Sequence, residues 1–140
     1  MTAPTTTTAD ETILRANASF YLAFTAGDYA AMSELWARRA PVTCLHPGAP
    51  VVVGRAAVLD GWRHILGGSS GGELRCEQPH VSLVGDTAIV TCYEAGGDDP
   101  AHLAATNVFV LEDGAWRMVH HHAGPLARQL QRRRPSSALN

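Results

Sequence analysis

The order of hydrophobic and polar positions divides this chain into a helical first half and a second half made of strands. After a Thr-rich start that we expect to be disordered over residues 1–9, Thr8 and Glu11 have the spacing of a helix capping box. Apolar positions then recur every three to four residues, which predicts an amphipathic helix to about Ala26, with Gly27 as its left-handed stop. The positions on its buried stripe are Ile13, Asn17, Phe20, Tyr21 and Phe24.

The remainder of the first half predicts two more helices and two short strands. Asp28 begins a second helix that ends before Pro41, and a third helix runs from about Arg55 to Leu66. Between them, residues 42–46 and 51–53 have the pattern of short strands around a Pro-Gly turn. The Gly/Ser-rich stretch 67–72 is expected to be a flexible loop.

The second half predicts a meander of long antiparallel strands. Asp113-Gly114 is a strong signal for a type I′ hairpin turn, and Gly85-Asp86 indicates another. The chain should end in a short basic helix stopped by Pro135, followed by a loose tail. Helices first and a strand meander last predict an α+β domain whose curved sheet closes over the helices and encloses a pocket. The strands are expected at 74–84, 87–95, 103–112 and 116–122.

Composition adds limits to this picture. The 140 residues are 46% hydrophobic and 17% charged with a net charge of -2, which predicts one globular domain without a general attraction to nucleic acid or membranes. No apolar run is long enough for a transmembrane helix, and the first residues lack the pattern of a secretory signal. Three cysteines, an odd number, indicate reduced and buried thiols, so we expect a cytoplasmic protein.

The triple histidine His120-His121-His122 is the main chemical signal. Because a strand sends successive side chains to opposite faces, His120 and His122 should share the face of Trp116 and Met118, with His121 on the other. The Trp and Met side chains predict that this face is covered by protein. His120 and His122 are therefore the candidate acid/base residues of a pocket, and His121 is expected to face outward.

The Asp113-Gly114 turn predicts which residues face each other across the hairpin. Counting back from the turn pairs Phe109 with Met118 and places Asn107 opposite His120. Asn107 is thus a candidate orienting or oxyanion donor. The alternative is that Asn107 and His120 simply satisfy each other by a cross-strand hydrogen bond.

Other side chains are candidates for lining the pocket, each with core packing or a surface position as the alternative. The face of Glu94 is left open by the loop that follows it. Four residues, Cys44, His46, His120 and His122, could also supply zinc ligands, but no close-spaced ligand motif supports this, and we expect no metal and no cofactor. The candidate ligand-binding residues are His46, Tyr21, Trp36, Trp62, Trp116, Phe109 and Glu94.

Several motifs together resemble the SnoaL-like branch of the nuclear transport factor 2-like (NTF2-like) superfamily. The resemblance covers residues 10–126 and leaves 127–140 as a basic helix end and tail. It rests on Phe20-Tyr21-Leu22-Ala23-Phe24, Ala26-Gly27-Asp28-Tyr29, Leu35-Trp36-Ala37, Cys44-Leu45-His46-Pro47-Gly48, Gly54-Arg55, Trp62-Arg63, Thr106-Asn107-Val108-Phe109 and the run from Asp113 to His122.

This resemblance implies a cone-shaped, cystatin-like half barrel, in which a curved sheet wraps about three N-terminal helices around a deep pocket, and a homodimer formed through the sheet. The superfamily includes ketosteroid isomerase, polyketide cyclases, limonene epoxide hydrolase and scytalone dehydratase. This chain shows no match to the aspartate base and tyrosine donor of the isomerases, or to the Asp-Arg-Asp set of the epoxide hydrolases. Its expected pocket is rich in histidine and poor in carboxylates.

Two functions follow as expectations. The first is binding of a small, largely apolar molecule that bears a carbonyl or hydroxyl group, with cofactor-free proton transfer such as dehydration, isomerisation or aldol-type cyclisation. The second is a non-catalytic ligand-binding or dimerisation module. Neither nucleic acid nor a membrane is an expected partner.

Overall fold

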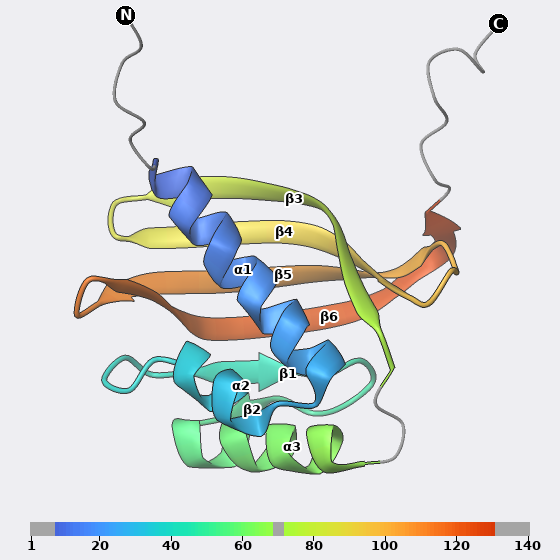
Figure 1. Ribbon diagram of the computed structural model, residues 1–140, viewed down its shortest axis with the longest axis horizontal. Coiled ribbons are helices and arrows are strands. Elements are labelled where there is room, and N and C mark those ends of the chain that lie inside the picture. Colours follow the sequence, from blue (N-terminus) through green and yellow to red (C-terminus); the bar gives the residue numbers. More distant parts are fainter. Residues whose placement is uncertain (1–7, 69–71, 131–140) are drawn as a thin grey trace, which may run out of the picture.

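The described part of the chain folds into three helices and one six-stranded sheet, which confirms the predicted α+β class (Figure 1). The computed structural model describes residues 8–68 and 72–130. The predicted tails at 1–7 and 131–140 and the middle of the predicted loop at 69–71 lie outside the described residues. The elements are α1 (Ala9–Ala26), α2 (Tyr29–Leu35), β1 (Thr43–Leu45), β2 (Val52–Val53), α3 (Arg55–Gly67), β3 (Leu74–Val84), β4 (Thr87–Gly96), β5 (Ala101–Glu112) and β6 (Ala115–Leu130).

The helix boundaries lie at the capping residues that the sequence indicates. The Glu11 amide donates to Thr8 Oγ1 (3.1 Å), and the Ala31 amide donates to Asp28 Oδ1 (3.0 Å). Gly27, with φ of 65°, ends α1 in the left-handed conformation that glycine adopts without steric cost. Ala9 is already helical, so α1 begins within the stretch 1–9 that was expected to be disordered. None of the helices within residues 8–68 and 72–130 has both the length and the apolar character needed to cross a membrane.

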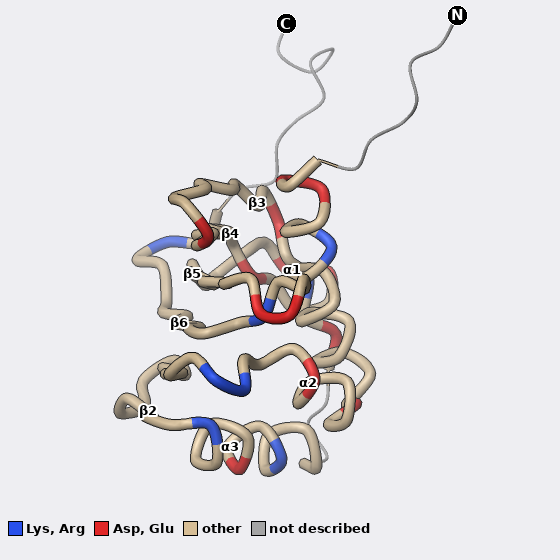
Figure 2. The backbone as a smooth tube through the Cα atoms, turned by 90° about the vertical axis from the view of Figure 1, so that its left-hand side faces the viewer, with Lys and Arg blue, Asp and Glu red and all other residues tan. Residues whose placement is uncertain are grey.

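The sheet has the strand order β2-β1-β6-β5-β4-β3, in which only the β1–β6 pair is parallel. Figure 1 shows α1 lying diagonally across the long strands, with α2 and α3 beside β1 and β2. The view turned by 90° shows α1 and α2 together on one side of the strands (Figure 2). Helices therefore cover one face of β3–β6, the inner face, and none of the helices within residues 8–68 and 72–130 covers the opposite, outer face.

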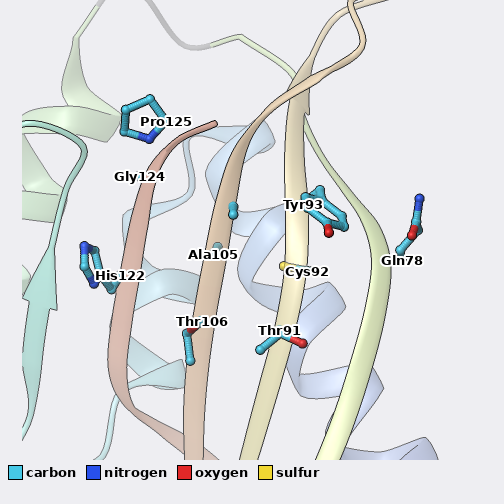
Figure 3. Close-up of a pocket in the computed structure, with 10 residues that line it drawn as sticks. Gln78, Thr91, Cys92, Tyr93, Ala105, Thr106, His122, Gly124 and Pro125 are labelled. Atoms are coloured by element: carbon cyan, nitrogen blue, oxygen red, sulfur yellow. The ribbon is translucent and has the colours of Figure 1, made fainter. Parts of the chain in front are cut away.

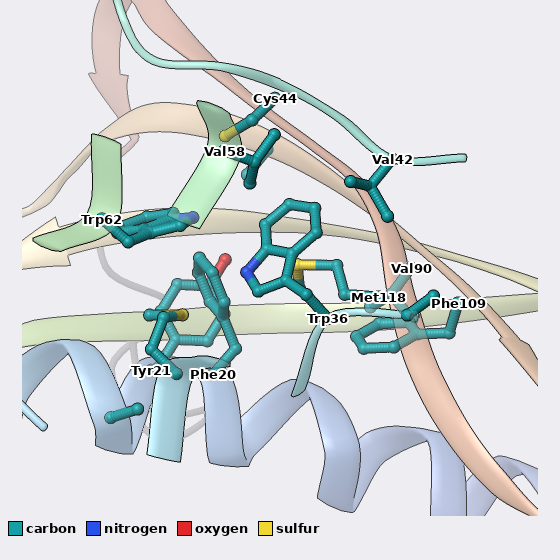
Figure 4. Packing of buried hydrophobic residues seen from close by; sticks show 14 of the residues in the cluster. Phe20, Tyr21, Trp36, Val42, Cys44, Val58, Trp62, Val90, Phe109 and Met118 are labelled. Carbon is teal, nitrogen blue, oxygen red and sulfur yellow. The ribbon is translucent and has the colours of Figure 1, made fainter. Parts of the chain in front are cut away.

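Large side chains fill the space between the helices and the inner face of the sheet (Figure 4). Trp36 follows α2 and forms a bridge with Met118 on β6, which directs its indole ring into the core. Burying each such side chain stabilises the fold by about 1.5–3 kcal/mol. The largest fully buried apolar side chains are Trp36, Trp62, Phe20, Phe109, Ile13, Met32 and Met118.

The β5–β6 hairpin confirms the predicted turn but not the predicted register beyond it. Asp113 and Gly114 both have positive φ (54° and 78°), as a type I′ turn requires, and Phe109 pairs with Met118 as expected. Val108, however, pairs with His120, so one extra residue, Val119, is inserted into β6. A bulge of one residue exchanges the two faces for every position after it.

The end of the described chain is a strand, not a helix. β6 continues to Leu130, which pairs with Ala101 on β5. The predicted helix from Leu126 is therefore wrong over residues 126–130. Residues 126–130 form a strand because the first residues of β5 are available to pair with them. The sequence pattern did not assign those first residues of β5 to a strand.

Candidate functional site

A small cavity of about 120 Å³ lies between α1, α3 and the inner face of the sheet. Its wall is mostly apolar, and its polar atoms come from two imidazoles and one carboxyl group. The lining residues are Phe20, Phe24, His46, Pro47, Trp62, Leu74, Glu94, Leu103, His121 and Ala123.

His121, the central residue of the triple histidine, is the one that reaches this cavity. Because the bulge at Val119 exchanges the faces, His121 is only 3% exposed, whereas His122 is exposed on the outer face. His120 is half-buried on the outer face, where its Nδ1 lies 2.6 Å from Oγ1 of Thr43. The prediction that His120 and His122 face inward and His121 outward is therefore wrong.

Asn107 contacts His121 instead of His120, and it decides which ring nitrogen carries the proton. Its Nδ2 donates to Asn17 Oδ1 (2.8 Å) and to the Tyr21 hydroxyl (3.1 Å), so Oδ1 is the amide atom that faces His121. Oδ1 can only accept, and therefore Nδ1–H of His121 donates to it at 2.6 Å. Nε2 of His121 is consequently the nitrogen with the lone pair.

Glu94 lies on the inner face of β4 and is 2% exposed. The Tyr21 hydroxyl donates to Glu94 Oε2 at 2.6 Å. Burial raises the pKa of Glu94, and the hydrogen bond from Tyr21 offsets this only in part. Burial, followed by the adjacent Glu94, raises the pKa of Tyr21 well above its ordinary value, so Tyr21 stays a neutral donor. The sequence left the face of Glu94 open, and the structure places it inside.

Both imidazoles of the cavity are neutral. Burial first, and then the charges of His46, His120 and His122, lower the pKa of His121 to about 3. Burial also lowers the pKa of His46, whose ring packs edge-on against Trp62 at 4.8 Å between centroids. The rings of His46 and His121 are 6.5 Å apart. The cavity thus contains two uncharged imidazoles beside the carboxyl group of Glu94, whose protonated form is favoured by burial.

The other predicted ligand-binding residues divide into three positions. Trp62 lines the cavity, and Tyr21 stands behind Glu94. Trp36 and Phe109 are fully buried in the core, and Trp116 is half-buried against it. None of these last three is among the cavity's lining residues within the described chain.

Two buried N–H donors have no hydrogen-bond partner among the described residues, Nε1 of Trp36 and Nε1 of Trp62. Figure 4 shows these two indole nitrogens turned toward each other. Buried donors in folded proteins are normally paired, so each of these calls for an acceptor such as a water or ligand oxygen.

The four residues considered for zinc do not converge. Cys44 is buried on the inner face, while His120 and His122 point to the outer face. Within residues 8–68 and 72–130, no group of three or more His, Cys, Asp or Glu side chains could hold a metal ion.

Asn17 is a member of the site that sequence reasoning did not single out. It is 2% exposed on α1 and accepts from Asn107. The sequence did contain an indication of this role, because Asn17 is the one amide on the apolar stripe of the first predicted helix. A buried polar residue on such a stripe needs a hydrogen-bond partner.

A second hollow of about 430 Å³ lies on the outer face of the sheet (Figure 3). Figure 3 views it from the side opposite to α1, with Thr91, Thr106 and His122 around it. His122 is thus separated from the inner cavity by the sheet itself.

Comparison with known proteins gives consistent results. The model of the SnoaL-like domain matches residues 13–128. A dehydratase-like protein of the NTF2-like family from Streptomyces avermitilis has 36% sequence identity and a TM-score of 0.75, covering 84% of this chain and 96% of that one. A protein from Thiobacillus denitrificans resembling the association domain of calcium/calmodulin-dependent protein kinase type II has 37% identity and a TM-score of 0.68, covering 89% of this chain and 99% of that one.

One curated relative is a plant protein. The F-box protein SKIP8 of Arabidopsis thaliana is 27% identical over 111 residues, which are 79% of this chain. The chain spans 48% of the length of that relative.

Proposed function

Since this chain belongs to the SnoaL-like domain family, as its motifs indicated, we propose that it binds a small, largely apolar molecule with a carbonyl or hydroxyl group in the inner cavity and transfers a proton on it. The observation that carries this proposal is the buried carboxyl group of Glu94, which Tyr21 holds through one oxygen at the wall of an apolar cavity. A carboxyl group with a raised pKa serves as an acid or a base near neutral pH.

The chemistry assigns separate roles to Glu94 and His121. An imidazole with a pKa of about 3 is too weak a base to remove a proton from carbon, so the proton-transferring group is Glu94. Nε2 of His121, held in one tautomer by Asn107, accepts a hydrogen bond from a ligand hydroxyl. Of the two roles expected for Asn107 from the sequence, orienting group or oxyanion donor, we assign it the first, as a positioning residue for His121.

The reaction is a proton transfer without a cofactor. The carboxylate of Glu94 takes a proton from the carbon beside a carbonyl group, and the carboxylic acid returns it. Transfer of this proton from Glu94 to a leaving hydroxyl group releases water, which is a dehydration. Transfer to another carbon of the ligand is an isomerisation.

Cavity size limits the ligand. An apolar cavity of about 150 Å³ accommodates benzene, so the 120 Å³ available here suits a ligand of about that size or smaller. Polycyclic ligands do not fit without rearrangement of the wall.

The test is hydrogen–deuterium exchange on small ketones. The full chain is incubated in D₂O with cyclic and linear ketones no larger than cyclopentanone, and deuterium at the carbon beside the carbonyl is followed by NMR. We expect exchange above the buffer rate that E94Q abolishes and that E73Q, a change at an exposed carboxylate, retains. Exchange at the buffer rate, or the same rate in E94Q, would contradict the proposal.

We propose in addition that the chain forms a homodimer through the outer face of its sheet. Half-buried apolar side chains of Ile89, Val108 and Val110 occupy this face, which the described helices leave uncovered. The similarity to the association domain from Thiobacillus denitrificans supports an assembly role, and such a role alone would make the chain a non-catalytic module.

Light scattering after size exclusion tests the dimer. The wild type should have the mass of two chains, and V108R should have the mass of one. L22R, which places the same charge on an exposed position of α1, is the matched control and should stay dimeric. A monomeric wild type would contradict the proposal.

A further inference from the structure

Two cysteines lie next to each other beneath α1, on neighbouring strands. Cys76 on β3 pairs with Glu94 on β4, and Cys92 precedes Glu94 by two residues on the same inner face. The two thiols are therefore diagonal neighbours across the β3–β4 ladder. The register of the ladder shifts between Glu77 and His80, beside these positions.

Polar side chains from α1 contact both sulfur atoms. Asn17 Nδ2 donates to Cys76 Sγ (3.4 Å), and the Tyr21 hydroxyl lies 3.2 Å from Cys92 Sγ. Asn17 and Tyr21 are one helical turn apart, and Nδ2 of Asn107 donates to both of them. The two sulfurs are thus attached to one hydrogen-bond network at adjacent points.

The two thiols differ in reactivity. The neighbouring Cys92 thiol is the largest influence lowering the pKa of Cys76, and the Cys76 thiol is the largest influence raising the pKa of Cys92. These opposite shifts favour Cys76 over Cys92 as the thiolate, which is the nucleophilic form. Cys44 differs from both, since burial raises its pKa to about 12.

Cys76 and Cys92 also differ in their exposure to solvent. Cys76 is half-buried and lines an apolar surface groove of about 450 Å³ between α1 and β3, together with Ala18, Leu22 and Leu74. Cys92 is only 4% exposed. A small oxidant therefore reaches Cys76 first.

From this arrangement we propose that Cys76 and Cys92 form a redox modification site, in which a hydroperoxide converts the two thiols into a disulfide. The Cys76 thiolate attacks the peroxide, whose O–O bond breaks, and gives a sulfenic acid plus water or an alcohol. The Cys92 sulfur then displaces hydroxide from Cys76, forming the S–S bond and releasing water. Two thiols lose two electrons and two protons, and the peroxide is reduced by the same two electrons.

Oxidation changes the candidate site because the sulfurs belong to its network. Cys92 contacts the Tyr21 hydroxyl that donates to Glu94, and Cys76 contacts the amide of Asn17 that holds Asn107. The disulfide moves both sulfurs toward each other and away from these partners. The pair is thus placed to couple the redox state of the chain to the carboxyl group of the cavity.

The test counts free thiols after treatment of the full chain with a small molar excess of hydrogen peroxide. Denatured chains are alkylated with N-ethylmaleimide and weighed by mass spectrometry. The reduced chain has three cysteines to alkylate, and we expect the oxidised chain to keep only Cys44. A thiol reductant should restore all three.

Variants and peptide mapping identify the bond. Cleavage after Glu77 and Glu94 separates Cys76 from Cys92, whereas trypsin leaves both between Arg75 and Arg117. C44S, the matched control, should still lose two thiols reversibly, and C76S and C92S should not. The proposal is overturned by three alkylated cysteines, by a bond to Cys44 or between chains, or by irreversible oxidation of Cys76 with Cys92 left free. None of these results depends on whether the cavity binds a ligand.

Discussion

Asn107 and His121 face each other across β5 and β6, and Nδ1–H of His121 donates to Asn107 Oδ1 at 2.6 Å. Because the Asn107 amide also donates to Asn17 and Tyr21, it has one possible orientation, and this orientation fixes the tautomer of the imidazole. A single buried amide thus connects the lone pair of His121 to the hydrogen bond that holds Glu94.

Replacing Asn107 with aspartate should raise the pKa of His121 from about 3, because an adjacent carboxylate favours the charged imidazole. The variant also loses the donors to Asn17 and Tyr21, so we expect lower stability, by about 1–3 kcal/mol for each buried partner left unpaired. NMR titration of the imidazole resonances in the wild type and the variant measures the pKa. An unchanged His121 titration would show that Asn107 does not control this ring.

The low pKa of His121 predicts how stability depends on pH. The unfolded chain binds a proton at the ordinary pKa of 6.5, whereas the folded chain does so only at about 3. Between these values the unfolded state holds more protons, so the free energy of unfolding falls as the pH falls, by up to about 1.4 kcal/mol per pH unit.

The matched variant is H121Q, which cannot titrate and still has an amide N–H for Asn107. Urea unfolding of both proteins between pH 7 and pH 4.5 should show a smaller loss of stability in H121Q. Equal losses in the two proteins would mean that His121 is not buried in its neutral form.

Glu94 has the opposite effect from His121 on how the free energy of unfolding depends on pH. Its folded pKa is raised by burial, so its favourable contribution is complete below the unfolded pKa and is lost as the pH rises through the folded pKa. E94Q stays neutral and still accepts from Tyr21, and it should therefore be more stable than the wild type at pH 7 and lose this advantage toward pH 4. Thermal unfolding across this range measures the difference.

Glu112 is the comparison residue for this experiment, because its pKa is shifted in the opposite direction from that of Glu94. The backbone amides of Arg38 and Arg39 donate to its carboxylate and lower its pKa. Its stabilisation is present above the unfolded pKa and is lost as the pH falls through the folded pKa. E112Q should therefore be less stable than the wild type at pH 7, with the difference closing in acid. If E94Q and E112Q changed stability in the same direction at pH 7, the assignment of Glu94 would be wrong.

The sequence predicted most elements of this fold because their signals are local. A capping box, a left-handed glycine stop and a type I′ turn each depend on a few neighbouring residues, and Thr8, Gly27 and Asp113 behave as expected. The four long strands, β3 to β6, and the third helix were predicted from the periodicity of their apolar residues, which is also a local property. The strand at residues 126–130 does not, because it is set by pairing with the start of β5.

The site was less predictable because one inserted residue reverses the faces of a strand. Val119 has no local feature that indicates a bulge, so Trp116 and Met118 were assigned correctly and the histidines after them were not. Asn107 was nevertheless identified, since it lies on β5, where the alternation is uninterrupted. The face of Glu94 depended on pairing with Leu103, across a loop of uncertain register.

Trp62 offers a test of what the cavity wall contributes to binding. Its ring lines the cavity, while its indole N–H is buried and faces Trp36 in the core. W62F should therefore weaken the binding of a small ketone and of a hydrocarbon of similar size by the same factor, because the ligand contacts the ring and not the N–H. Calorimetry with the two ligands measures both affinities. A loss confined to the ketone would show that the N–H reaches the ligand.

Gly61 on α3 is a position where stability and the cavity can be changed together. A Cβ atom there would lie 3.8 Å from Nε2 of His46, an ordinary van der Waals contact, and the glycine stands within a regular helix. G61A should therefore stabilise the chain by about 0.5–1 kcal/mol through helix propensity, while it further removes His46 from water and keeps its pKa low. Gly54, with φ of 95° at the start of α3, is the contrasting site, since alanine there is strained and G54A should destabilise. Thermal unfolding of the two variants, with an NMR titration of His46 in G61A, checks both effects, and a G61A protein less stable than the wild type would show that His46 and α3 have no room for the added methyl group.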